Sequence, residues 1–267
     1  MGQIVDQCGG CSYEANYKAN SDIGIVLNIA EEYVVAKDDP TAGIVVVDEV
    51  NGFCTAGCGN LAPVKDDPII NKMIDETDKL IRSMPNSPVL VLQDTHEADK
   101  PEPPYPPHCV RGTGEELIVP KLDWLSTRKN TYILKKDVIN GFIGSMEHRD
   151  KYDSEDGIGD YAYTLCDELF FYGKKITSLI ITGICTDICV MQFVQSVLSA
   201  RNHGIFTTVK DIVVLVPAVS TYDLPLEATK QLGLPDSLAH PRELTHKMGL
   251  YFMQMSGAIL TDKIVVK

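Results

Sequence analysis

The sequence is poor in basic residues and has no long apolar run. Its 267 residues include 24 Lys and Arg against 37 Asp and Glu, giving a formal net charge of −13 at pH 7. A surface with this field repels phosphate backbones and anionic bilayers, so we expect neither nucleic acid nor a membrane as a partner. No apolar stretch reaches the roughly 18–20 residues that a membrane-spanning helix requires.

The start of the chain also lacks a recognisable signal. Residues 1–22 have neither the basic beginning nor the apolar segment of a secretory signal. The 8 cysteines are spread along the chain, unlike those of a secreted disulfide scaffold, so we expect reduced thiols and a cytoplasmic protein. Cys8 and Cys11 form a C-x-x-C pair, but no second ligand pair follows at zinc-knuckle spacing. Residues 1–40 are interpreted as a mobile N-terminal leader, and residues 41–267 as one domain.

From residue 41 onward, short β-branched apolar runs alternate with segments of helical periodicity. Strands are predicted at residues 42–50, 87–94, 131–136, 176–183 and 208–220, with a short one in 258–267; helices are predicted at residues 66–84, 160–175, 187–204 and 240–257. Such alternation is typical of a parallel sheet with right-handed crossovers. We therefore predict a three-layer α/β fold, a doubly wound and mostly parallel sheet with helices on both faces.

Reactive side chains lie at the predicted carboxyl ends of these strands. Asp48 ends the first strand, Asp94 the second and Lys136 the third, while Cys185 and Cys189 follow the fourth. Doubly wound sheets bind their ligands at this edge. We therefore expect a carboxylate, an amine and a thiol to converge there.

The stretch IITGICTDICVMQFV, residues 180–194, carries two of the cysteines. Thr186 is predicted to cap the helix that follows, which places Cys189 in its first turn. The positive helix end would lower the pKa of a thiol there. On position alone, three interpretations of Cys189 stay open: a nucleophile, a small buried hydrophobe, or half of a redox or metal pair with Cys185.

Three motifs in this order resemble the isochorismatase-like cysteine hydrolases. They are VVVDEVNGFC, LKKDVINGF and TGICTDICV, each at a predicted strand end, and the resemblance covers about residues 42–260. It implies that Cys189 is the nucleophile and Asp48 the proton carrier. Lys136, six residues before Phe142, would be the cation beside both.

The resemblance also gives a role to Cys185. It implies a cis peptide bond between Ile184 and Cys185, and an oxyanion site made by the backbone N–H groups of Cys185 and Cys189. With these groups the chain would open an amide through a cysteine thioester and then hydrolyse the thioester.

A proline-rich loop at residues 94–120 narrows the implied substrate. It contains Asp94, His96 and His108, a carboxylate and two imidazoles, which suit one divalent metal ion such as zinc. The order D-x-H followed by YPPHCVRGT resembles the nicotinamidases, and VNGFC, INGF, SARNHG and DLPL resemble their plant-type branch. In that family the metal holds the pyridine nitrogen of the substrate. Phe53 and Tyr105 would then be the aromatic walls that bind the ring, although either could equally serve packing.

The implied function is hydrolysis of nicotinamide to nicotinate and ammonia in NAD salvage. Two alternatives stay open: hydrolysis of another small amide or ureide, and a non-catalytic α/β binding protein on the same scaffold. The first motif reads DEVNGF where many relatives have D-x-Q-N-D-F, so no role is assigned to the two differing positions. Residues 49–60 lack the G-x-G-x-x-G of a nucleotide-binding Rossmann module. Relatives are often oligomeric, which makes a homo-oligomer an expectation of the resemblance.

Overall fold

A central parallel sheet organises the part of the chain that the computed structural model describes, residues 24–100, 102–145 and 175–267. Its strand order is β1-β8-β7-β6-β3-β4-β5, and each neighbouring pair is parallel. The strands are β1 (Ile29–Ala30), β3 (Ala42–Val47), β4 (Val89–Asp94), β5 (Thr131–Lys136), β6 (Ser178–Ile184), β7 (Asp211–Ser220) and β8 (Ile259–Thr261). This order confirms the predicted doubly wound sheet.

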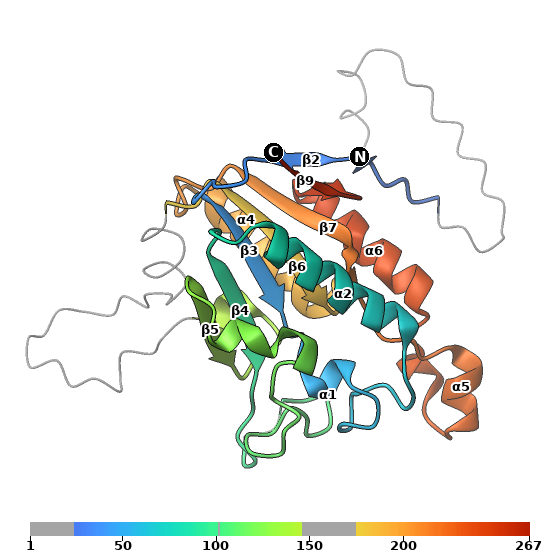
Figure 1. The fold of residues 1–267 in the computed structure, drawn as a ribbon. Coiled ribbons are helices and arrows are strands. Elements are labelled where there is room, and N and C mark those ends of the chain that lie inside the picture. Colours follow the sequence, from blue (N-terminus) through green and yellow to red (C-terminus); the bar gives the residue numbers. More distant parts are fainter. Residues whose placement is uncertain (1–23, 101, 146–174) are drawn as a thin grey trace, which may run out of the picture.

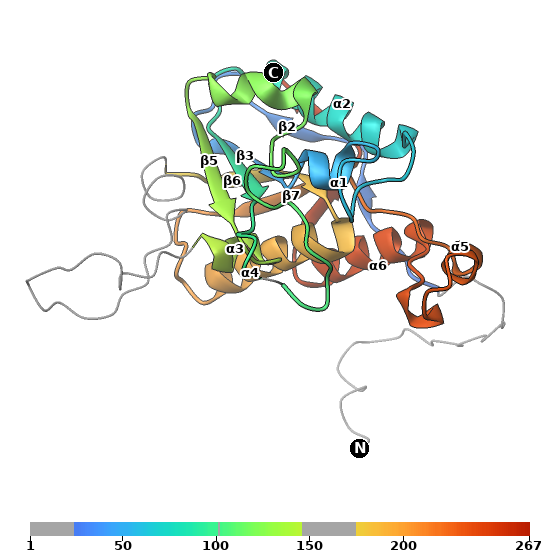
Figure 2. The same ribbon diagram turned by 90° about the horizontal axis from the view of Figure 1, so that it is seen from below.

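Helices cover both faces of the sheet (Figures 1 and 2). They are α1 (Asn51–Cys54), α2 (Pro68–Ser83), α3 (Gly141–Gly144), α4 (Met191–Asn202), α5 (Leu226–Gln231) and α6 (Arg242–Met255), with 3₁₀ turns η1 (Pro120–Ser126) and η5 (Asp236–Leu238) and a π-helical turn η4 (Thr186–Val190). Within the described ranges, every helix is too short or too polar to span a bilayer. The helix predicted at residues 160–175 and the Cys8/Cys11 pair fall outside the described part, except for Lys175.

The two faces of the sheet build two separate cores, as strand alternation requires. Ile44 and Val46 of β3 belong to the core under α2 and η1. Val45 and Val47 of the same strand belong to the core under α4 and α6. The three predicted layers are therefore confirmed.

The boundaries and the buried faces of helices α2 and α4 follow from their sequence. Asp67 accepts hydrogen bonds from the N–H groups of Ile69 and Ile70 and so caps α2, with Pro68 at its first position. An apolar stripe that starts at the end of η4 and continues along α4 is buried throughout (Val190, Phe193, Val194, Val197 and Leu198). Gly204 ends this helix with φ +85°, as expected of a residue after the C-cap.

Two short strands before residue 41 pair with the C-terminal end of the chain. β1 lies beside β8, and β2 (Tyr33–Val35) forms a second, two-stranded parallel sheet with β9 (Ile264–Val266). Figure 1 shows β2 and β9 side by side at the amino end of the main strands. Residues 29–35 fall within the predicted leader, because strands of two or three residues leave no periodic signal. A boundary at residue 41 stays a prediction.

The strand order reverses between β3 and β6. The chain runs outward through β4 and β5, then crosses back to place β6 on the other side of β3. At their carboxyl ends Val47 pairs with Gly183. Gly183 has φ +120°, and a Cβ there would collide with the backbone of Val47, so only glycine fits. Asp48 and the cysteine segment therefore leave the sheet next to each other at its switch point, where such folds bind ligands.

Candidate active site

A buried lysine joins the carboxylates that end β3 and β4. Lys136 Nζ lies 2.9 Å from Asp48 Oδ2 and 2.8 Å from Asp94 Oδ1. Lys136 Nζ donates a hydrogen bond to Asp94 Oδ1 and forms an ion pair with Asp48 Oδ2. All three side chains are almost fully excluded from solvent. The structure thus brings together three of the predicted strand-end residues.

The two carboxylates titrate in opposite directions. Burial raises the pKa of Asp48 to about 7, against the lowering effect of the Lys136 charge, and the charge of Asp94 adds to the rise. Burial also acts to raise the pKa of Asp94, but Lys136 and the two loop histidines hold it well below its usual value. Asp94 is therefore the fixed anion of the pair. Asp48 is placed to gain and lose a proton near neutral pH, as a general base requires.

Cys189 lies on η4 and is buried, with 8% of its surface exposed. Burial raises the pKa of its thiol well above the usual value, and the charge of Asp48 adds to the rise while Lys136 opposes it. The predicted lowering by a helix end is therefore wrong for the resting protein, because desolvation of the thiolate outweighs the helix dipole. The thiol also lies near enough to Asp48 to lower that carboxyl's pKa. Asp48 is therefore placed to take the proton from the Cys189 thiol when the sulfur attacks a substrate.

The segment before Cys189 differs in one respect from the expectation. The peptide bond between Ile184 and Cys185 is cis, as the resemblance implied. Thr186 is not a helix cap: η4 begins after Cys185 without a side-chain cap, and Thr186 Oγ1 instead lies 2.8 Å from Nδ1 of His246. The π-helical turn places the backbone N–H groups of the segment differently from an ordinary first turn.

The loop after β4 assembles the predicted metal ligands. Ligand atoms of Asp94, His96 and His108 lie within 4.8 Å of one another, and the three residues are buried. Nε2 of His96 is 3.1 Å and Nε2 of His108 is 3.3 Å from Asp94 Oδ2. His108 Nδ1 lies 2.8 Å from the carbonyl oxygen of Pro106, which fixes that proton and leaves Nε2 as the lone-pair donor. The residues therefore fit a divalent metal.

Glu102 faces the same group and is not among the predicted ligands. Its Oε2 lies 3.7 Å from Nε2 of both His96 and His108, and its Oε1 accepts a hydrogen bond from Ile139 N. Its position, six residues after His96 and six before His108, does not by itself mark it as a ligand in the sequence.

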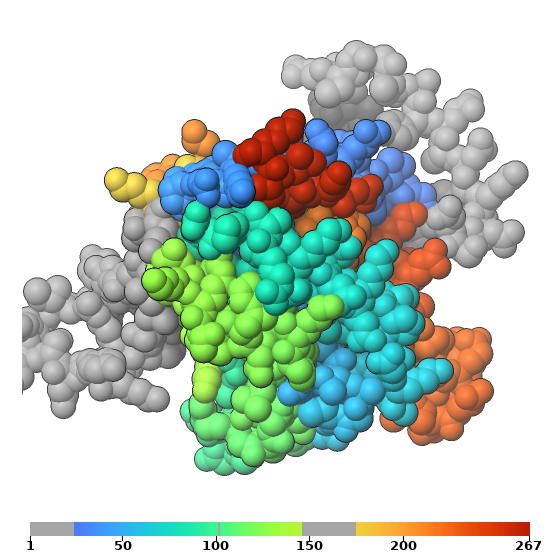
Figure 3. All heavy atoms as spheres, viewed as in Figure 1, coloured from blue at the N-terminus to red at the C-terminus, as the bar shows by residue number. Residues whose placement is uncertain are grey.

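The two predicted aromatic walls flank the metal group. The ring centroid of Phe53 is 5.6 Å and that of Tyr105 is 6.1 Å from that of His108. Phe53 sits on α1, which the loop contacts through Gly52 N and the carbonyl oxygen of Glu115. Figure 3 shows the atoms of α1, in blue, next to those of this loop, in green.

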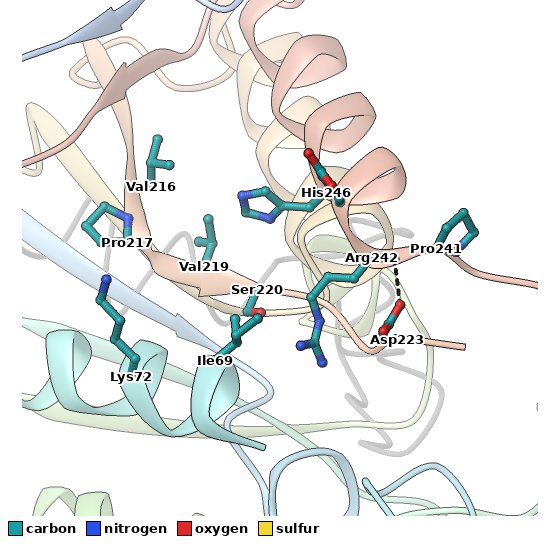
Figure 4. A pocket seen from close by; sticks show the side chains of 11 residues that line it. Ile69, Lys72, Val216, Pro217, Val219, Ser220, Asp223, Pro241, Arg242 and His246 are labelled. Carbon is teal, nitrogen blue, oxygen red and sulfur yellow. Dashed lines mark hydrogen bonds between the residues drawn. The ribbon is translucent and has the colours of Figure 1, made fainter. Parts of the chain in front are cut away.

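A separate pocket opens between α2, β7 and α6 (Figure 4). Its lining includes Lys72, Val219 and Arg242, whereas Asp48, Lys136 and Cys189 are absent from it. Arg242 forms an ion pair with Asp67, the cap of α2. This pocket is distinct from the candidate active site.

Glu49, next to Asp48, is a buried carboxyl with a single well-formed hydrogen bond. Its Oε1 accepts from Thr77 Oγ1 at 2.7 Å, while Oε2 has no partner within the described ranges. Burial raises its pKa to about 8, against the opposing hydroxyls of Thr77 and Thr182. Glu49 is therefore protonated in the folded protein at neutral pH.

Glu49→Gln should make stability less sensitive to pH. The folded protein holds a proton on Glu49 that the unfolded chain has lost between about pH 4.5 and pH 8, so the wild-type free energy of unfolding falls as pH rises through this window. The slope is at most about 1.4 kcal/mol per pH unit. Glutamine keeps the acceptor for Thr77 and cannot titrate, so urea denaturation at pH 5 and pH 8 should show a smaller fall.

The matched control is Glu227→Gln, on the exposed first turn of α5. It should leave the pH dependence of the wild type unchanged. Parallel curves for Glu49→Gln and the wild type would contradict the prediction.

Comparisons with known proteins agree with this geometry. None of the models of protein families matches the sequence. Nicotinamidase 1 of Arabidopsis thaliana is 43% identical over 236 residues, which is 88% of this chain and 91% of that protein.

Solved structures show the same fold at lower identity. Nicotinamidase PncA from Bacillus subtilis is 22% identical, with TM-score 0.54 over 83% of this chain and 99% of that one. PnC1 from L. infantum in complex with nicotinate is 16% identical, with TM-score 0.56 over 88% and 100%. An isochorismatase-like hydrolase from Alkaliphilus metalliredigens is 17% identical, with TM-score 0.53 over 83% and 94%.

Proposed function

We propose, since the chain belongs to the nicotinamidase family, that it hydrolyses nicotinamide to nicotinate and ammonia with Cys189 as nucleophile. The observation that carries the proposal is the Lys136 bridge, which joins Asp48 beside the thiol to Asp94 in the metal-ligand group. Acyl-transfer groups and ring-binding groups thus form one continuous site. The reaction would serve NAD salvage, and the place of the enzyme would be the cytoplasm.

The first half of the reaction forms a thioester. Asp48, as carboxylate, takes the proton from the Cys189 thiol while the sulfur attacks the amide carbonyl carbon. The backbone N–H groups of Cys185 and Cys189 would hold the developing oxyanion. Asp48 then returns the proton to the departing nitrogen, the C–N bond breaks, and ammonia leaves.

The second half regenerates the thiol. Asp48 takes one proton from water, whose oxygen attacks the thioester carbonyl, and the C–S bond breaks to give nicotinic acid, which releases the other water proton to solvent and becomes nicotinate. The proton on Asp48 returns to the Cys189 sulfur. Lys136 stays cationic throughout, because the charges of Asp48 and Asp94 raise its pKa well above the usual value although burial acts to lower it. It compensates the negative charge that passes between sulfur and carboxylate.

Asp94, His96 and His108 would hold one divalent metal, for which we propose zinc, with Glu102 as a further carboxylate beside it. When bound, this ion would offer a coordination position to the pyridine nitrogen of the substrate. Phe53 and Tyr105 would limit the tilt of the ring, and fixing both the ring and the amide is the positioning that raises kcat.

Ammonia release from nicotinamide tests the proposal. We expect release by the purified protein, a rise in KM of at least about 10-fold after chelation, and recovery on adding zinc. His108→Ala should lose bound metal, measured by elemental analysis as well as by activity. His203→Ala, at an exposed histidine outside the group, should keep both.

Two outcomes would contradict parts of this assignment. An apo protein with unchanged KM would show that the loop group does not hold the substrate. Absence of ammonia release with a readily alkylated Cys189 would instead indicate a cysteine hydrolase for another small amide or ureide. We also propose, from the family resemblance, that the protein is a homo-oligomer. Sedimentation of the same preparation would test this.

A further inference from the structure

The segment that carries Cys189 is held by a histidine that no motif singled out. Asp187 Oδ2, in η4, lies 2.8 Å from Nε2 of His240. His240 is buried and stands just before α6, at the end of the excursion of residues 222–240 that contains α5 and η5. Figures 1 and 2 show this excursion projecting beside α6 at the end of the molecule where the carboxyl ends of the strands lie.

Three contacts fix the imidazole ring of His240. Its Nδ1 lies 3.0 Å from the carbonyl oxygen of Tyr222, opposite the nitrogen that faces Asp187. Its ring stacks on that of Tyr222, with centroids 3.8 Å apart and an interplanar angle of 13°. The carbonyl and the carboxylate contact opposite nitrogens of the ring, so together they hold it in one orientation. The ring, held in this way, fixes the position of the Asp187 carboxylate.

Helix α6 also packs against the turn η4. A Cβ at Gly249 would lie 2.7 Å from the Cα of Asp187 and 2.8 Å from the carbonyl oxygen of Thr186, so the helix packs directly on the turn. His246 reaches Thr186 from the same helix and projects toward β7 in Figure 4. These contacts fix the backbone and Thr186, and His240 adds the hold on the Asp187 side chain.

We propose that His240 is a positioning residue, which acts through Asp187 to hold the Cys189 sulfur and the neighbouring N–H groups in reacting geometry. Asp187 is two residues before Cys189 within the five-residue turn η4, so the contact with His240 holds the same short segment that carries the thiol. A displacement of about 1 Å in a reacting group costs about 100-fold in rate. The inference rests on the proposed function only in taking Cys189 as the reacting thiol.

Two substitutions at one position separate the hydrogen bond from the stacking. His240→Phe keeps an aromatic ring against Tyr222 and removes both ring nitrogens, whereas His240→Gln supplies an amide N–H within reach of Asp187. We expect His240→Phe to lower kcat about 10- to 100-fold with KM changed less than about 2-fold, and His240→Gln to recover part of the loss. His203→Phe, at an exposed site, should match the wild type.

A second readout needs no substrate. The rate at which iodoacetamide alkylates Cys189, followed by mass spectrometry of its peptide, should fall in His240→Phe and recover in His240→Gln. This result in a protein inactive on nicotinamide would contradict the proposed function and still support the positioning role. Unchanged kcat and alkylation in a folded His240→Phe would overturn the inference, and so would a raised KM with unchanged kcat, which would place His240 in the substrate wall.

Discussion

Cys189→Ala should abolish turnover of nicotinamide, with kcat reduced by about 10⁴-fold or more. Alanine removes the only atom that can form the thioester and leaves Asp48 and Lys136 in place. The fold should survive, because the thiol fills a small buried volume and truncation to alanine removes one atom. Steady-state kinetics, with thermal unfolding as the check on folding, measures the effect.

Cys185→Ala is the matched control, four residues away in the same segment. No chemical step is proposed for its thiol, whose pKa burial and the charge of Asp187 raise to about 12. Its proposed contribution is its backbone N–H, which alanine retains. We expect a loss below about 10-fold; similar losses for the two cysteines would refute the division of roles between them.

The fold could be predicted because its buried strands carry their own signal. Residues 42–47 are apolar on both faces, which marks a central strand of a parallel sheet, and Val190, Phe193, Val194, Val197 and Leu198 recur at helical spacing. The parallel strand-helix order then placed Asp48, Asp94, Lys136 and Cys189 at one sheet edge. Their convergence followed from topology.

What could not be predicted depends on distance in the sequence. Glu102 approaches His96 and His108 only because the proline-rich loop folds back, and His240 meets Asp187 across 53 residues. Neither contact has a local pattern. The direction of the Cys189 pKa also required the structure, because helix position is visible in the sequence and desolvation is not.

Replacement of Lys136 by methionine should have the second large effect, on stability as well as on activity. The amine is the shared partner of two buried carboxylates, and methionine fills a similar volume without charge. Breaking a buried ion pair from one side costs about 3–5 kcal/mol, because the remaining charge has no compensation. We therefore expect Lys136→Met to lower the free energy of unfolding by about this amount, measured in urea after chelation, and to be inactive.

Removing one of the two carboxylates that lose Lys136 as a partner should restore part of that stability. In Lys136→Met combined with Asp48→Asn, a single buried carboxylate, Asp94, remains, and two histidines contact its second oxygen. The double variant should thus be more stable than Lys136→Met alone, although Asp48→Asn by itself removes a partner of Lys136 and should be neutral or destabilising. If the two substitutions were instead additive, Lys136 and Asp48 would not be coupled in the fold. The charge compensation assigned to Lys136 during catalysis would then lose its physical basis.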